Sequence, residues 1–193
     1  MNKNENKVPV EISARHIHLT QENVEKLFGE GYKLNSLKKL SQPGQFAASE
    51  TVDVVGLKGE LKNVRVIGPC RLFNQVEVTI TEGRKLGDIP PVRVSGDIIG
   101  TPGILLRGPK GEVKLDKGLI CALRHIHMSP YEAKSFGLKA KQRVSVEIFG
   151  SRALIFHDVI IRVHPNFKLS FQIDTDEGNA ADVGLGDFGR LII

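Results

Sequence analysis

A four-residue stretch that occurs twice constrains the fold of this chain more than any other feature. Residues 15–18 read Arg-His-Ile-His, and residues 124–127 repeat them 109 positions later. Side chains alternate between the two faces of a β-strand, so a His-x-His pair on a strand presents both imidazoles on one face. On a helix the same spacing would turn the two rings apart. The repeat therefore predicts two related units, each with a histidine pair on one strand.

Two further pairs of segments support an internal duplication. Residues 63–69 resemble residues 158–165, and residues 77–83 resemble residues 172–178 at an offset of 95. Because this offset is smaller than that of the histidines, we expect extra residues in the first half, in a polar loop over residues 31–48. Short alternating segments separated by turn signals are typical of small barrels or sandwiches. We therefore expect a mainly β fold of two small β-barrels, with a few short helices.

Periodicity and capping signals place the individual elements. Residues 8–19 alternate between apolar and polar like one strand, and Thr20 is a suitable N-cap for a helix that Gly29 ends. Residues 72–81 alternate like a second strand, and residues 83–91 read as a connector rich in turns. Residues 1–7 form a short polar tail, which we expect to be disordered.

Composition narrows the class of protein and its ligands. The chain of 193 residues contains no apolar run as long as a membrane span, and from its polar first residues we expect no secretory signal. Its two cysteines are isolated, which favours reduced thiols and a cytoplasmic setting. The net charge of +5 suits an anionic ligand such as a phosphorylated cofactor. Basic residues do not cluster with aromatic ones, which argues against nucleic acid as a partner.

The repeated histidines are the best candidates for metal ligands, since imidazole is the commonest protein ligand of transition metals. Two imidazoles alone bind weakly, so each pair needs a third ligand. The alignment of the two halves nominates Glu77 for His16 and His18, and its repeat partner Gln172 for His125 and His127. Glutamine is neutral and a poorer ligand, so the second site is expected to be the weaker one.

Other polar residues near these motifs have alternative interpretations. Glu22 and Glu132 follow the two histidine pairs, as in a cupin metal motif, but Glu132 fits better as part of a helix capping box. Arg71 precedes Glu77 by a few residues and could bind phosphate in bidentate fashion. Ser95 could donate a hydrogen bond to the same anion.

Three stretches of this sequence, in this order, resemble the PduL-type phosphate propanoyltransferases, a family of phosphotransacylases. They are Ser-Ala-Arg-His-Ile-His-Leu at residues 13–19, Arg-His-Ile-His-Met-Ser at residues 124–129, and Ile-Asp-Thr-Asp-Glu-Gly-Asn-Ala at residues 173–180. The resemblance extends over nearly the whole chain from Val8. It implies a metal-dependent enzyme that exchanges a short acyl group, propanoyl in the named activity, between coenzyme A and inorganic phosphate.

The resemblance also implies an architecture and a set of site residues. One barrel would contain residues 8–14 with residues 123–193, and the other residues 15–122. Of two zinc ions, one would bind His16, His18 and Glu77 near the coenzyme A sulfur. The other would bind His125, His127 and a histidine that is replaced by Gln172 in this sequence. Arg71 would hold the phosphate, with coenzyme A and a short acyl-CoA as the other substrates.

Members of the family that are packaged into bacterial microcompartments, such as those of propanediol degradation, often carry an amphipathic N-terminal extension. Only seven residues, mostly polar, precede Val8 in this sequence, so we expect a free cytoplasmic enzyme that binds no membrane. The sequence leaves open a homo-oligomer, association with a microcompartment shell and the microcompartment lumen as its location. Two alternatives also stay open: a cupin-like metal-dependent oxygenase or isomerase that uses Glu22, and a non-enzymatic binding module.

Overall fold

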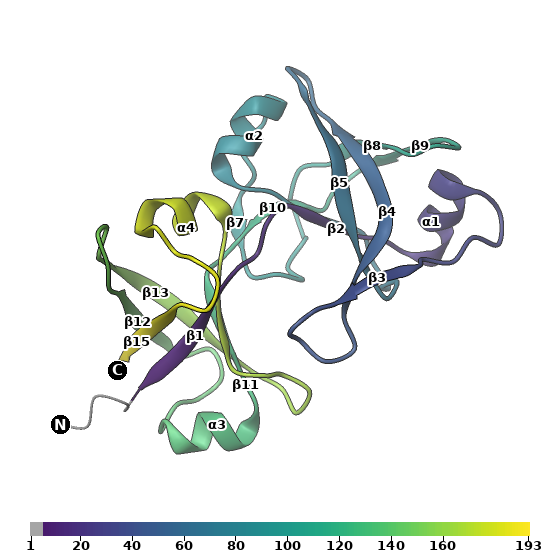
Figure 1. The fold of residues 1–193 in the computed structure, drawn as a ribbon. Helices are drawn as coiled ribbons and strands as arrows, with labels where there is room; N and C mark the ends of the chain where they lie inside the picture. The colour runs from purple at the N-terminus through teal and green to yellow at the C-terminus, as the bar shows by residue number, and fades with distance from the viewer. Residues whose placement is uncertain (1–5) are drawn as a thin grey trace. The chain divides into compact units, whose positions relative to one another are not determined.

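The computed structural model describes residues 6–193, and these residues form short strands and four short helices (Figure 1). The chain divides into two compact units. The barrel unit contains the described residues up to Ala14 together with Leu123–Ile193, and the sheet unit contains Arg15–Ala122. The prediction of a mainly β fold with a few short helices is confirmed.

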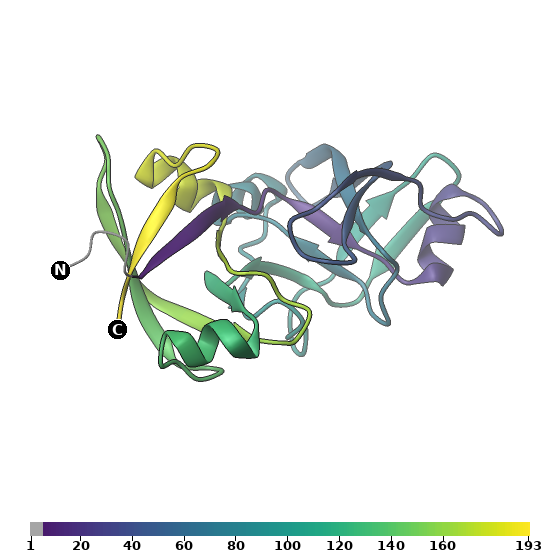
Figure 2. The ribbon, with the colours of Figure 1, turned by 60° about the horizontal axis from the view of Figure 1, so that its bottom comes forward.

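The barrel unit is a closed barrel of six strands in the order β1-β14-β11-β13-β12-β15. Its strands are β1 (Lys7–Ile12), β11 (His125–Met128), β12 (Arg143–Ile148), β13 (Leu154–Val163), β14 (Ser170–Ile173) and β15 (Phe188–Ile192), and its helices are α3 (Pro130–Ser135) and α4 (Thr175–Ala181). The first strand closes the barrel by pairing with β14 on one side and with the last strand, β15, on the other. Figures 1 and 2 show β1, in purple, beside β15, in yellow. Apolar side chains of alternating residues, among them Val8, Val10, Ile126 and Phe171, fill its core.

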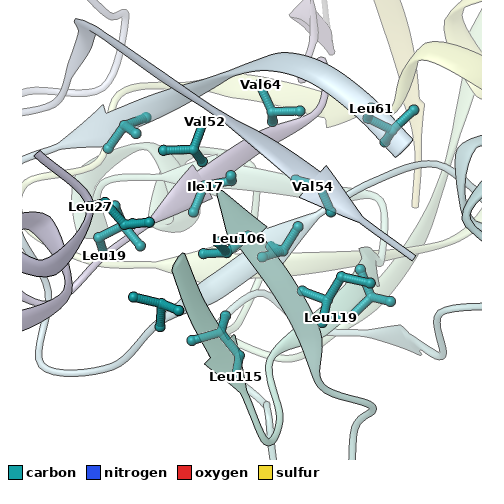
Figure 3. Packing of buried hydrophobic residues seen from close by; sticks show 14 of the residues in the cluster. Ile17, Leu19, Leu27, Val52, Val54, Leu61, Val64, Leu106, Leu115 and Leu119 are labelled. Atoms are coloured by element: carbon teal, nitrogen blue, oxygen red, sulfur yellow. The ribbon is translucent and has the colours of Figure 1, made fainter. Parts of the chain in front are cut away.

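The sheet unit is one sheet of nine strands, so the second predicted barrel is present as an open, half-barrel sheet. Its strands are β2 (His16–His18), β3 (Ser36–Lys39), β4 (Phe46–Val55), β5 (Glu60–Gly68), β6 (Gln75–Glu77), β7 (Val92–Arg93), β8 (Ile104–Arg107), β9 (Glu112–Leu115) and β10 (Leu119–Ala122), and its helices are α1 (Gln21–Phe28) and α2 (Ile80–Leu86). Ile17 of β2 lies among Val52, Leu106 and other buried aliphatic side chains (Figure 3). Burial of Ile17 directs the flanking histidines to the opposite face of the sheet.

The two units repeat the same arrangement of strands around the histidine pairs. In the sheet unit β2 lies between the parallel β5 and the antiparallel β6, and in the barrel unit β11 lies between the parallel β13 and the antiparallel β14. Asn63 and Asp158, 95 positions apart, have left-handed φ values of 54° and 57° at matching places in β5 and β13. Asn and Asp tolerate this backbone conformation better than most residues. These matches are independent of the histidines and support an internal duplication.

A helix start and an ion pair are also repeated. Thr79 caps α2 and Asp174 caps α4, and each forms a capping box with the glutamate three residues later. That glutamate binds the arginine that precedes the histidine pair: Arg15 lies 2.6 Å from Glu82, and Arg124 lies 3.1 Å from Glu177. The repeated arginine thus links β2 to the start of α2 in the sheet unit, and β11 to the start of α4 in the barrel unit.

Several sequence predictions of local structure were wrong. Residues 8–19 form two strands rather than one, because β1 belongs to the barrel unit and β2 to the sheet unit. The loop predicted over residues 31–48 contains β3 and the start of β4. The strand predicted over residues 72–81 is limited to β6, because Thr79 caps a helix, α2, which also replaces part of the connector predicted over residues 83–91. Side-chain capping here outweighs the alternation that suggested a strand.

The predicted tail, residues 1–7, lies mostly outside the described residues, and its last residue, Lys7, begins β1. In the part of the chain that the structure describes, no helix has both the length and the apolar character needed to cross a membrane.

The duplication supplies a matched pair of substitutions that tests the packing of α2 and α4. A Cβ on Gly83 would collide with the rigid ring of Pro90 and lie 2.7 Å from the Asp88 carbonyl oxygen, whereas a Cβ on Gly178 would meet only the flexible end of Ile12 at 2.8 Å. Gly83→Ala should therefore destabilise the protein by about 1–3 kcal/mol, as overpacking does. Alanine gains about 1 kcal/mol of helix propensity over glycine in either helix, and only in Gly178→Ala is this enough to offset the strain, which is a small shift of Ile12. Thermal unfolding of the two variants measures the difference, and equal melting temperatures would contradict this packing.

Candidate active site

His16, His18 and Glu77 come together on one face of the sheet unit. His16 and Glu77 are directly opposite each other in the antiparallel pair of β2 and β6, and His18 is two residues further along β2. The His16 Nε2 lies 3.6 Å from a Glu77 carboxylate oxygen, and the two imidazole centroids are 4.9 Å apart. One ligand atom from each of the three residues lies within 4.8 Å of the others, which is a spacing that a single metal ion can bridge.

His18 is held in the form that binds metals. Burial lowers the pKa of its imidazole well below the ordinary value, and the neighbouring charges of His16 and Arg71 lower this pKa further. The ring is therefore neutral at pH 7. Its Nδ1 lies 3.3 Å from the Ile67 carbonyl oxygen, which can only accept a hydrogen bond, so Nδ1 carries the proton. The Nε2 of His18 is left with a lone pair for a metal ion.

Glu77 is a buried carboxylate that stays ionised. Burial by itself would raise its pKa, but the proximity of His16 and His18 and a hydrogen bond from Ser95 outweigh burial and hold the pKa below its ordinary range. The same oxygen, Oε1, accepts hydrogen bonds from the Gln75 amide at 2.5 Å and from the Ser95 hydroxyl at 2.7 Å. Gln75 is itself fixed by the Gly96 N–H, which donates to its amide oxygen at 2.8 Å.

This network identifies a role for Gln75 that the sequence analysis missed. Gln75 lies on the same strand face as Glu77, but only its burial, together with the fold of residues 95–96 onto it, reveals the contact. The hydroxyl proton of Ser95 is directed at Glu77, and the suggestion that Ser95 binds phosphate stays a prediction. Hydrogen bonds from outside the ligand set commonly orient a metal-binding carboxylate.

Ser95→Ala should weaken metal binding without disrupting the fold. The variant removes a side-chain donor to Glu77 Oε1, and loss of such a supporting hydrogen bond typically costs about 10–100-fold in metal affinity. Competition with a zinc chelator of known affinity measures the change, and Ser95→Thr, which retains the hydroxyl, is the matched control. An unchanged zinc affinity in Ser95→Ala would contradict a positioning role for this hydroxyl.

Arg71 brings a permanent positive charge to this cluster. It lies in the segment between β5 and β6, where its backbone N–H donates to the Leu19 carbonyl oxygen at 2.8 Å. Its side chain is half-buried, and its charge acts directly on the pKa of His18. The structure therefore places an arginine beside the candidate metal ligands, where it can attract an anion.

Glu22, the carboxylate of the cupin-like alternative, is not part of this cluster. It is exposed on α1 and pairs with Lys26, one helical turn later, at 2.6 Å. Glu132 is the acidic partner of Ser129 in the capping box of α3, as the sequence predicted. The structure thus gives the cupin-like interpretation no third ligand from Glu22.

The second histidine pair is buried on β11, and Gln172 lies opposite His125 on β14. The two imidazole centroids are 4.5 Å apart, and His125 Nδ1 is 2.8 Å from the Leu123 carbonyl oxygen. The Gln172 amide nitrogen donates to the Glu11 carboxylate and, at 2.9 Å, to the Ser170 hydroxyl. Two imidazoles and a neutral amide do not match the donor set at His16, His18 and Glu77, and they fit a zinc ion poorly.

Comparison with known proteins decides the family. The family model for phosphate propanoyltransferase matches residues 9–184, which is nearly the whole chain. This chain belongs to the phosphate propanoyltransferase family. It is an enzyme of the acyltransferase class, as the resemblance of its motifs predicted.

Curated members of the family are similar to this chain over almost their full length. The phosphate propanoyltransferase of Thermotoga maritima is 52% identical over 184 residues, covering 95% of this chain and 88% of the relative. That of Leptotrichia buccalis is 53% identical, covering 94% of this chain and 86% of the relative. That of Clostridioides difficile is 49% identical, covering 98% of this chain and 91% of the relative.

Proposed function

We propose that this enzyme is a metal-dependent phosphate propanoyltransferase that exchanges an acyl group between coenzyme A and inorganic phosphate. The observation that carries the proposal is the convergence of two imidazoles and an ionised carboxylate beside Arg71, in a chain that belongs to this family. The net charge of +5 suits two anionic substrates. The acyl group is taken from the name of the family and its curated members.

The residues of the cluster would have separate roles in metal binding, in orienting the ligands and in binding phosphate. A zinc ion held by His16, His18 and Glu77 would polarise the thioester carbonyl and stabilise the departing thiolate. Gln75 and Ser95 keep the Glu77 carboxylate oriented, and burial keeps His18 neutral and ready to bind. Arg71 would orient phosphate for direct attack on the acyl carbon, since guanidinium binds phosphate in bidentate geometry.

Direct transfer requires no acyl-enzyme intermediate. The phosphate oxygen forms the new bond to the acyl carbon, the carbon–sulfur bond breaks, and coenzyme A departs as the thiolate. The thiol of Cys70 is partly buried beside Arg71, and burial raises its pKa, which makes it a poor nucleophile at neutral pH. The proposed mechanism therefore does not use Cys70 as a nucleophile.

A thiol-release assay tests the proposed function. Purified enzyme is mixed with propanoyl-CoA with and without inorganic phosphate, and free thiol is followed with a chromogenic reagent. We expect thiol release that depends on phosphate and produces propanoyl phosphate in equal amount. Release at the same rate without phosphate would indicate a hydrolase, and no release with any short acyl-CoA would contradict the proposal.

A further inference from the structure

The duplication allows each position of the candidate metal site to be compared with its counterpart in the barrel unit. His125 and His127 occupy the positions of His16 and His18, and the strands on either side pair in the same directions. The backbone frame for a second three-ligand site is therefore present. The side chains around the third position decide whether a metal ion binds there.

At the third position the two units differ in which strand bears the carboxylate: β6 bears it in the sheet unit, and β1, the neighbour of β14, bears it in the barrel unit. In the sheet unit Glu77 pairs with Ile120 of β10, and in the barrel unit Gln172 pairs with Glu11 of β1. Glu11 and Ile120 are 109 residues apart, the same offset as the histidines, so they are repeat partners. The sheet unit thus pairs an acidic residue with an apolar one, whereas the barrel unit pairs an amide with an acidic residue.

The direction of the hydrogen bonds is reversed as well. Glu77 accepts hydrogen bonds from Gln75 and Ser95, which hold a carboxylate in place. Gln172 instead donates both amide hydrogens, one to Glu11 and one to Ser170, the repeat partner of Gln75. The negative charge of Glu11 is therefore engaged by the amide. Within residues 6–193, ligand atoms of three His, Cys, Asp or Glu residues lie within 4.8 Å of one another only at His16, His18 and Glu77.

We propose that the barrel unit holds no tightly bound metal ion, and that the Glu11–Gln172–Ser170 network takes the place of a metal by joining β1 to β14. Taken together with the metal site of the proposed function, this gives one metal ion per chain, in the sheet unit. Two imidazoles without a third histidine, cysteine or carboxylate ligand lack the donor set of a stable zinc site. The proposal concerns the barrel unit alone and does not depend on the proposed function.

Metal content after exposure to zinc tests this proposal. Each protein is stripped with chelator, incubated with excess zinc ions, dialysed and measured by elemental analysis. The His125→Asn/His127→Asn variant should retain as much zinc as the unsubstituted protein. Gln172→His, which supplies a third imidazole and frees Glu11, should gain one ion per chain. A loss of one ion per chain in the double variant would overturn the proposal.

Two controls keep the result interpretable. If the double variant fails to fold by circular dichroism, the comparison of the unsubstituted protein with Gln172→His decides, and two zinc ions per chain in both proteins would overturn the proposal. A His16→Asn/His18→Asn variant reports on the sheet unit separately. Retention of zinc by that variant would count against the proposed function, and it would leave the comparison in the barrel unit intact.

Discussion

Replacement of His18 by alanine is expected to lower kcat/KM by about a thousandfold or more. His18 is buried, neutral at pH 7 and oriented by the Ile67 carbonyl, so its Nε2 can bind a metal ion without a prior loss of a proton. A catalytic metal supplies several kcal/mol of transition-state stabilisation, and about 4 kcal/mol corresponds to a thousandfold in rate. The phosphate-dependent thiol assay measures the rate, and elemental analysis of the same sample should show the loss of the ion.

His157→Ala is the matched control for this variant. His157 is exposed on β13, where its ring lies 2.9 Å from the Ser145 hydroxyl, and it belongs to neither histidine pair. We expect His157→Ala to retain the activity and metal content of the unsubstituted enzyme. A folded His18→Ala variant with an unchanged rate would rule out a catalytic role for the cluster.

Arg71→Ala is expected to raise the KM for phosphate and to lower kcat/KM for phosphate by about a hundredfold or more. Two charge-assisted hydrogen bonds to the anion contribute about 1.5–3 kcal/mol each, and 1.36 kcal/mol corresponds to a factor of ten. Arg71→Lys keeps the charge but loses the bidentate geometry, so it should recover only part of the activity. Steady-state kinetics with phosphate and propanoyl-CoA varied separately measure both effects.

The substrate dependence of the Arg71 variants distinguishes phosphate binding from a general electrostatic role. The KM for propanoyl-CoA and the zinc content should stay close to those of the unsubstituted enzyme. Arg84→Ala, which removes an exposed charge on α2, controls for the change in net charge and should leave both KM values unaltered. A rise in both KM values in Arg71→Ala, or no rise in either, would contradict a specific role in holding phosphate.

The duplicated motif made much of the candidate site predictable from sequence. A His-x-His pair on a strand fixes the face of both imidazoles, and an alignment of the two halves led to Glu77, which the structure places opposite His16. The mainly β class followed from short alternating segments. These inferences depend on strand geometry, which is local and regular, and this is why they could be made without coordinates.

The rest of the site depends on contacts between distant segments. Ser95 reaches Glu77 across 18 residues and Gln75 across 20 residues, and no local pattern indicates either hydrogen bond. The exchange of a carboxylate between β14 and β1 involves Glu11 and Gln172, which are 161 residues apart. Alternation likewise could not locate the break between β1 and β2, because both strands continue the same pattern in different units.

The most direct test of the metal centre is a zinc titration of chelated enzyme, with the metal content and the phosphate-dependent release of thiol measured on the same samples. If His16, His18 and Glu77 hold the catalytic ion, removal of metal should abolish the activity. The activity should then return in proportion to added zinc and reach its full value at one ion per chain. Full activity in a sample that elemental analysis finds free of metal would contradict this account.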